Sequence, residues 1–172
     1  AEGTALDLNA LPAGGRYKVI FPSGGRVTGQ SRATVTLYAA NGTITVDGPP
    51  NSTVGSNMGQ AAARDKLPVV GMIARDIKIN PNVTTVNAVM YATYDFDTCA
   101  VSNWTTQCKS LLTIKGFAMA RTFSFKRVSA SANGLQKGEQ IDFNAAFYLN
   151  PPPGFGDQSK LMKYLGERAP LY

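Results

Sequence analysis

The chain has 172 residues, of which 44% are hydrophobic and 16% charged, and it contains no histidine. This length and composition indicate one folded domain rather than a disordered chain. The longest apolar runs are far short of the ~20 residues that a membrane-spanning helix needs. Catalysis by Ser–His–Asp or Cys–His is excluded because histidine is missing. The chain starts at Ala1 without a methionine, so we expect a processed or excised piece.

The net charge of +6 is unevenly distributed along the chain. Residues 1–50 carry four basic and three acidic side chains, residues 51–110 carry five and four, and residues 111–172 carry eight and four. A basic end can meet anionic polymers or lipid headgroups, but scattered basic residues are typical of a solvated surface. No arginine-rich run or recognition-helix pattern accompanies them, so we expect no specific nucleic-acid binding.

The first third of the chain predicts short strands and one long loop. Residues 1–16 are expected to be a loosely held lead-in, since three leucines are their main apolar anchors. Alternating apolar and polar residues predict three strands, at 17–21, 32–39 and 43–46. Asn41 and Gly42 favour a hairpin turn, or a corner if the strands stack as a solenoid. Residues 47–66 have too few apolar side chains to build a layer and predict an extruded loop.

A repeated strand-type pattern occupies residues 67–128. Segments 74–79 and 120–125 share the order small, Arg, polar, apolar, polar, apolar. The equivalent alanines, 18 and 28 residues apart, are Ala74, Ala92 and Ala120. The shorter step suits one coil of a parallel β-helix, and the longer step suits a coil with an insertion at 98–107. The pattern therefore predicts an all-β fold, a right-handed parallel β-helix (β-solenoid), with an antiparallel β-sandwich as the alternative.

The C-terminal part predicts a last strand at 140–143, followed by a break and a cap. Consecutive prolines after residue 150 remove ladder donors and end regular pairing. Ser159 can cap a short helix at 160–165, and an open β stack needs its end covered. The expected organisation is a lead-in at 1–16, a β-solenoid domain at 17–150, and a Pro-rich break with a capping tail at 151–172.

Cys99 and Cys108 are the only cysteines, and they flank the insertion. A disulfide between them would contribute ~2.5–3 kcal/mol through loop-closure entropy and would imply an oxidising, extracytoplasmic compartment. The alternative is two buried free thiols. Two cysteines without histidine supply too few ligands for zinc, so no metal or cofactor is expected. Trp104, near the tip of the loop, is either a recognition anchor or a side chain folded onto the solenoid wall.

Asp95 and Asp97 lie two positions apart on a predicted strand, hence on one face, with Asp76 a layer below. Paired carboxylates on a β-helix wall can bind calcium or perform acid and base catalysis on sugars. No further oxygen ligand is spaced to join them, which favours solvated wall positions and no catalytic residues. Elimination by a basic residue is conceivable, but no feature distinguishes one among Arg75, Lys78 and Arg121.

The order of several motifs between residues 67 and 150 is distinctive. They are Asn80-Pro81-Asn82-Val83-Thr84, Val86-Asn87-Ala88-Val89, Asp97-Thr98-Cys99, Cys108, Leu112-Thr113-Ile114-Lys115-Gly116 and Glu139-Gln140-Ile141-Asp142-Phe143. This order resembles the β-helical C-terminal domains of large surface-exposed, sometimes pilus-associated proteins of small-genome episymbiotic bacteria. The resemblance implies an extracellular β-solenoid with the two cysteines bridged and no assigned activity. The chain departs from the pattern at Thr93-Tyr94-Asp95-Phe96, where a glycine-containing turn is usual.

These expectations describe a non-enzymatic extracellular module that serves structure or adhesion in a cell-surface or pilus-associated protein. The expected contact residues are Trp104, Lys126 and Arg127, from the disulfide loop and the basic C-terminal third. The expected partners are a cell-surface glycan, a protein of another cell, or further subunits of a filament. Two other hypotheses stay open: a self-assembling filament or surface-layer subunit, and a carbohydrate-active β-helix enzyme.

Overall fold

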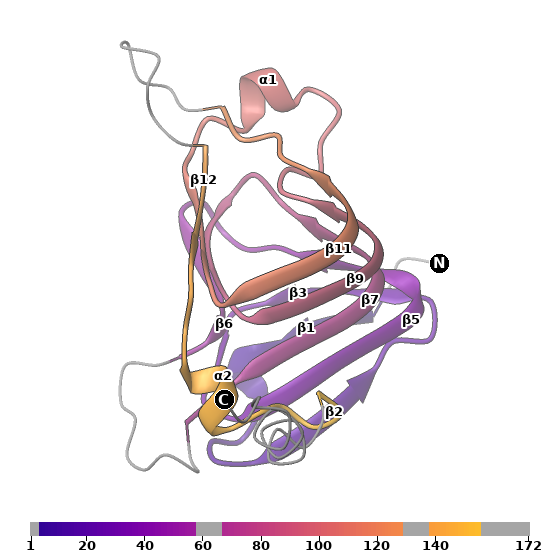
Figure 1. Ribbon diagram of the computed structural model, residues 1–172, viewed down its shortest axis with the longest axis vertical. Helices are drawn as coiled ribbons and strands as arrows, with labels where there is room; N and C mark the ends of the chain where they lie inside the picture. Colours follow the sequence, from indigo (N-terminus) through magenta and orange to yellow (C-terminus); the bar gives the residue numbers. More distant parts are fainter. Residues whose placement is uncertain (1–3, 58–66, 129–137, 156–172) are drawn as a thin grey trace, which may run out of the picture.

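The computed structural model describes residues 4–57, 67–128 and 138–155, which form two β-sheets (Figure 1). Sheet A contains β1 (Thr4–Asp7), β2 (Arg16–Ile20), β3 (Gly24–Thr28), β5 (Thr34–Val46), β7 (Val70–Ile79), β9 (Val89–Asp97) and β11 (Phe117–Ser124). Sheet B contains β4 (Gln30–Ser31), β6 (Ser52–Ser56), β8 (Val83–Asn87), β10 (Leu112–Lys115) and β12 (Glu139–Asp142). Three short helices accompany them: η1 (Leu8–Ala10), α1 (Trp104–Gln107) and α2 (Ala146–Leu149).

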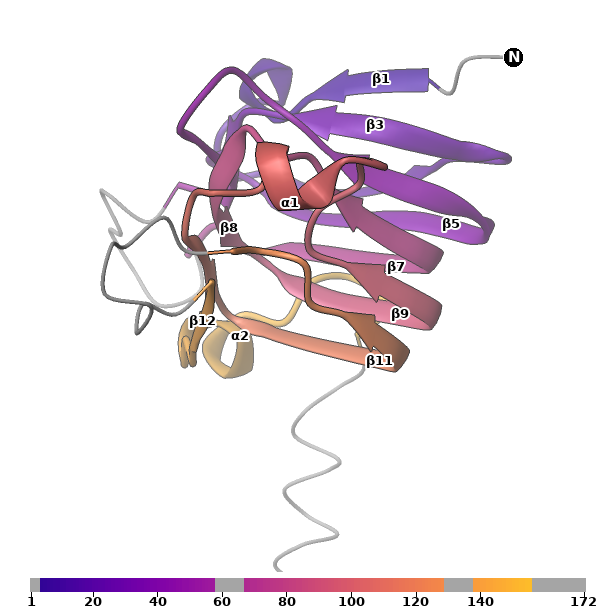
Figure 2. The ribbon, with the colours of Figure 1, turned by 90° about the horizontal axis from the view of Figure 1, so that it is seen from above.

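The chain alternates between the two sheets, and each return adds a strand beside the previous one. Sheet A has the order β1-β3-β5-β7-β9-β11 with β2 also beside β5, and sheet B has the order β12-β10-β8-β6-β4. All strand pairs in the described ranges are parallel, and Figure 2 shows the sheet-A strands stacked in succession. The all-β prediction is confirmed. The antiparallel sandwich alternative is wrong, because every pair runs parallel.

The repeat predicted from the sequence corresponds to a real column in sheet A. Ala74 pairs with Ala92, and Ala92 pairs with Ala120. A further member, Ala39, pairs with Ala74 from the preceding strand. The longer, 28-residue step between Ala92 and Ala120 contains the disulfide loop and β10. Small side chains at this position leave room for the larger inward residues beside them.

Sheet A has a register shift directly after this alanine column in three consecutive strand pairs. In β5 residues 40–42 are unpaired opposite the single residue Arg75 of β7, so Asn41 and Gly42 lie inside one strand whose two halves both pair in parallel with β7. The hairpin interpretation is therefore wrong. A Cβ at Gly42 would overlap the backbone of Gly24 in β3, which makes glycine necessary there. In β9 the shift falls at Thr93 and Tyr94.

The inward side chains of both sheets form one buried cluster that extends through successive strands. Large members are Leu37, Met72, Met90 and Phe96 from sheet A, and Val54, Val86, Leu112 and Ile114 from sheet B. Each fully buried aliphatic or aromatic side chain contributes ~1.5–3 kcal/mol relative to an exposed one. Because each strand buries its inward residues against its neighbours, the stack stabilises itself layer by layer.

Two segments are more regular than the sequence predicts. Within the expected lead-in, β1 pairs with β3, and Leu8 of η1 is fully buried. Within the expected loop at 47–66, β6 pairs with both β4 and β8 and buries Val54 in the core. A short strand with a single inward apolar residue shows little alternation of apolar and polar side chains. Both strands are therefore missed when strands are predicted from alternation alone.

The last described segment, residues 143–155, leaves the stack and runs back across the outer face of sheet A; we call it the strap (Figure 1). Phe147 of α2 is buried with Val69 and Val89 and packs edge-on against Phe117, with ring centroids 6.3 Å apart. Further along, a Cβ at Gly71 would overlap the Phe155 ring, so glycine at 71 allows the strap to lie close to β7.

Hydrogen bonds fasten the strap to earlier strands. The buried Asn150 amide donates to the Thr34 hydroxyl at 2.9 Å and to the Leu67 carbonyl at 2.7 Å. Arg16 of β2 donates to the Asn150 side chain and to the Pro151 carbonyl, and Thr36 of β5 donates to the Pro153 carbonyl. The strap therefore connects β11 at one end of sheet A with β2 near the other. The helix expected at 160–165 lies outside the described residues.

Candidate functional site

The insertion at 98–107 is a loop closed by a disulfide between Cys99 and Cys108, whose Cα atoms are 6.2 Å apart. Both cysteines are fully buried, and the Ala100 amide donates to the Ile79 carbonyl at 2.9 Å, which ties the loop to β7. The predicted disulfide is confirmed. Trp104 begins α1, the helix that projects at the top of Figure 1, and its side chain is 38% exposed. A partner can therefore contact Trp104.

Arg127 lies inside the fold, although the sequence suggests a contact role for it. Its residue exposure is 6%. The guanidinium donates to the carbonyls of Thr98 and Pro81 at 2.8 Å, and to those of Asn80 and Val83 at 3.0 Å. Four of its five N–H groups are thus occupied by backbone oxygens, and an external ligand has no access to them.

Acidic side chains surround this buried cation. Burial lowers the pKa of the Arg127 guanidinium, and the carboxylates of Glu139 and Asp97 act in the opposite direction. Glu139 accepts hydrogen bonds from the Arg127 amide at 2.8 Å and from the Thr98 hydroxyl at 2.7 Å. Lys126, the neighbouring candidate, places its Nζ 2.6 Å from Asp97 Oδ2 and is only partly exposed. Two cations and two carboxylates therefore form a charge-balanced brace that joins consecutive layers.

Asp76 and Asp95 lie at partly exposed wall positions, whereas Asp97 is buried, so the expected solvated position is wrong for Asp97. Asp76 pairs in register with Asp95, as expected for adjacent layers, and accepts a hydrogen bond from the Asp95 amide at 3.3 Å. Asp95 also accepts from the Ser124 hydroxyl at 3.1 Å. Asp97 accepts from the Cys99 amide at 2.9 Å in addition to its ion pair with Lys126. Among the described residues no group of three or more His, Cys, Asp or Glu side chains is placed to hold a metal.

A group of tyrosine and arginine side chains lies on the outer face of sheet A. Ile73 of β7, Tyr91 of β9 and Met119 of β11 are register partners and point outward. The residues at the register shift lie beside them and form a second column. We call these six residues the Tyr–Arg face: Ile73, Arg75, Tyr91, Tyr94, Met119 and Arg121.

Tyr94 holds both arginines of this face. The Arg75 Cζ lies 5.6 Å from the centroid of the Tyr94 ring, and the Arg121 Cζ lies 5.8 Å from it. Such cation–π contacts contribute ~0.5–1 kcal/mol at exposed sites. The Tyr94 residue is 48% exposed, and both arginines are exposed, so the guanidinium edges remain accessible. Arg75 Nε lies 3.8 Å from Asp76 Oδ2, a loose ion pair.

The far end of the stack, at β11 and β12, presents apolar side chains. Phe123 and Ile141 continue the inward columns of Phe96 and Ile114, which are fully buried, yet both are substantially exposed. Phe123 stacks on the more exposed Phe125, with ring centroids 5.5 Å apart. Of the segments described, none lies beyond these two edge strands in the sheets. A cap or a partner is required to cover this end.

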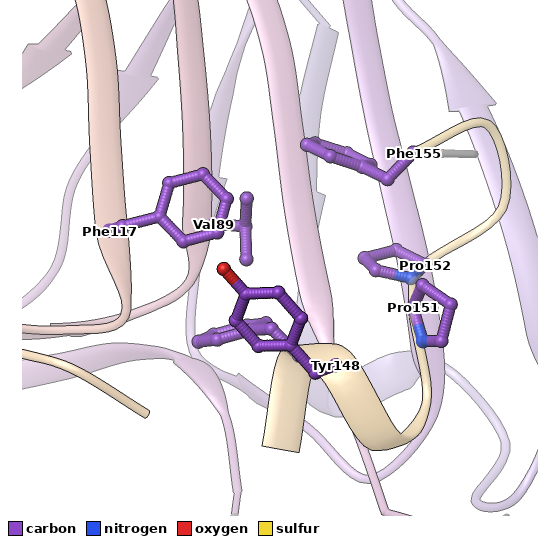
Figure 3. Close-up of a pocket in the computed structure, with 7 residues that line it drawn as sticks. Val89, Phe117, Tyr148, Pro151, Pro152 and Phe155 are labelled. Atoms are coloured by element: carbon purple, nitrogen blue, oxygen red, sulfur yellow. The ribbon is translucent and has the colours of Figure 1, made fainter. Parts of the chain in front are cut away.

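A small hollow lies between the strap and sheet A (Figure 3). It has a volume of about 40 Å³, and its wall is apolar, with the Tyr148 ring beside Val89 and Phe117 on one side and Pro151, Pro152 and Phe155 on the other. Ligand sites for metabolites have volumes of ~300–1,000 Å³. The hollow is thus a packing gap along the strap rather than a substrate site.

Comparisons with protein-family models, with curated proteins and with solved structures find no match to this chain. The described residues also include no helix long and apolar enough to cross a membrane.

Proposed function

We propose that this chain is a non-enzymatic extracellular module for structure or attachment, built as a right-handed parallel β-solenoid. The observation that carries the proposal is the single buried cluster shared by two parallel sheets, between which the chain alternates. Successive coils of a solenoid give a rigid body with long, open faces that suit the binding of large partners. The internal hydrogen bonds of Asp95, Asp97 and Arg127 support a structural role for these charged residues.

The disulfide supports placement outside the cytoplasm, since such bonds persist in oxidising compartments. The resemblance of residues 67–150 to surface and pilus-associated β-helical domains leads to the same expectation. Mass spectrometry of the protein from its natural source, with and without reductant, tests this part. A mass gain of two hydrogens on reduction is expected, and free thiols at both cysteines would contradict an extracellular location.

Attachment is tested by binding to cells and to a glycan array, with wild type compared with Trp104→Ala. Trp104 is accessible at the tip of a loop fixed by the disulfide, so its truncation is expected to weaken binding to a protein or glycan partner. Equal binding by both proteins would show that Trp104 of the disulfide loop does not contribute to binding. Absence of binding to any cell or glycan would overturn the attachment function itself.

Self-assembly into a filament is a second candidate, favoured by the exposed apolar end at β11 and β12. The first proposal needs no self-association, whereas in the second a further subunit covers that end. Sedimentation of the full chain over a range of concentrations separates them. Concentration-dependent association that Phe123→Asp abolishes would support the filament, and a monomer at all concentrations would exclude it.

A further inference from the structure

The Tyr–Arg face combines exposed positive charge with apolar surface along a line. The strands of a sheet lie ~4.8 Å apart, so Arg75 on β7 and Arg121 on β11 are separated by two strand spacings, ~10 Å at the backbone. The column of Ile73, Tyr91 and Met119 runs parallel to them and in register. The face is therefore extended in the stacking direction and repeats from strand to strand, which suits a linear ligand better than a compact one.

The charges of this face are incompletely neutralised. Within residues 4–57, 67–128 and 138–155, no carboxylate lies within ion-pair distance of Arg121, and Arg75 has only its loose contact with Asp76. Two guanidinium groups held on one tyrosine ring repel each other, and a bound anion relieves that repulsion. A guanidinium edge matches a carboxylate in a bidentate arrangement. Tyr94 thus positions two anion-binding groups.

The apolar column supplies the other half of the recognition surface. Tyr91 and the neighbouring Met119 are both exposed. The tyrosine ring is apolar, and its hydroxyl can donate and accept hydrogen bonds. A sugar ring has the same mixed character, with C–H groups on its faces and hydroxyls at its rim. Single-stranded nucleic acid also stacks on aromatic rings, but it binds through a row of phosphate contacts, whereas the basic residues are scattered along this sequence.

We propose that the Tyr–Arg face binds a linear polysaccharide bearing carboxylate groups. Its carboxylates contact Arg75 and Arg121, and a sugar ring between them rests on Tyr91. The inference rests on the proposed attachment function and names the ligand class for it. Because the site is open and charged, binding depends on several weak contacts along the polymer and weakens as salt screens the arginines.

Biolayer interferometry with the full chain tests the proposal. The probes are polygalacturonate, its fully methyl-esterified form, and single-stranded DNA of similar length. Wild type is expected to bind polygalacturonate and to bind the neutral ester at least about tenfold more weakly, since the ester removes the charge-assisted contacts. Equal binding to the ester, or tighter binding to the DNA, would overturn the assignment.

Matched variants separate this face from general positive charge. Arg75→Gln with Arg121→Gln is expected to reduce the affinity for polygalacturonate at least about tenfold, and Tyr91→Ala tests the sugar contact without changing the charge. The control is Lys109→Gln with Lys115→Gln, which removes the same charge from exposed residues elsewhere. An equal loss in the control, or no loss with Tyr91→Ala, would overturn the proposal.

The outcome also distinguishes the ligand class from the function. If wild type binds cells but none of the three probes, the polysaccharide assignment is wrong and the attachment function stands. If it binds neither cells nor probes, both are wrong. All three substituted face residues are exposed, so unchanged circular dichroism is expected for each variant.

Discussion

Replacement of Arg127 by methionine tests the view that this residue holds the layers together. Methionine has a similar length and no N–H donors, so the carbonyls of Asn80, Pro81, Val83 and Thr98 each lose a hydrogen bond. The Asn80 and Pro81 carbonyls follow β7, the Val83 carbonyl begins β8, and the Thr98 carbonyl follows β9. The Arg127 amide donates to Glu139 at the start of β12. Arg127 therefore connects three consecutive layers, through its side chain to the two preceding layers and through its backbone amide to β12.

The expected cost follows from the burial of the cation and its neighbours. Removing one partner of a buried charged group costs ~3–5 kcal/mol, because the remaining carboxylates lose the positive charge and the carbonyls lose the N–H donors that they face. Lys126→Met is the matched control, since the Lys126 ammonium is partly exposed and the buried Asp97 keeps its hydrogen bond from the Cys99 amide, so the loss is expected to cost ~1 kcal/mol or less. Arg127→Lys retains the charge but not the fork geometry and is expected to fall between the two.

Urea unfolding followed by circular dichroism measures these differences. The account predicts that Arg127→Met lowers the free energy of unfolding by at least ~3 kcal/mol, and that Lys126→Met changes it by ~1 kcal/mol or less. Hydrogen exchange should show the loss of protection first in β10, β12 and the turns that Arg127 contacts. If the two methionine variants are equally stable, the reasoning about the buried brace is refuted.

Three further changes test other parts of the fold. Reduction of the disulfide between Cys99 and Cys108 should lower the free energy of unfolding by ~2.5–3 kcal/mol in urea titrations, and no shift would contradict stabilisation by loop closure. Gly116→Ala places a Cβ against the Ala88 carbonyl and should cost ~1–3 kcal/mol; unchanged thermal stability would show that this turn can relax. Met72→Ala empties a core position and should cost ~2–5 kcal/mol, whereas the exposed Met119→Ala should change stability by less than ~0.5 kcal/mol, and similar costs would contradict the assigned faces.

Much of the layered region is predictable because its side chains repeat with strand periodicity. The alanines 74, 92 and 120 align as the sequence pattern predicts, and the two segments that share the Arg-containing pattern are two layers apart in the same sheet. By contrast, β1 and β6 contribute few inward apolar residues. They are identifiable only from their parallel pairing with neighbouring strands in the structure. Asn41 and Gly42 look like a hairpin turn in isolation, but parallel pairing on both sides incorporates them into β5.

The candidate site was less predictable, for a physical reason that differs between residues. Arg127 is basic and lies in the basic third of the chain, but its burial depends on carbonyls from turns up to 47 residues away. Tyr94 lies at a register shift, where simple alternation no longer assigns a face, so its position between Arg75 and Arg121 follows only from the stacking of three strands. The disulfide required only the local spacing of the two cysteines, whereas the exposure of Trp104 was left open by the sequence and is seen only in the structure.

The central claim is that successive strands run parallel and stack their inward side chains into one column. Nuclear Overhauser contacts between backbone protons of neighbouring strands test it most directly. The account predicts contacts that advance together along both strands, with Met72 near Met90 and Ala74 near Ala92. Contacts that advance along one strand while they recede along the other, as in an antiparallel pair, would contradict it.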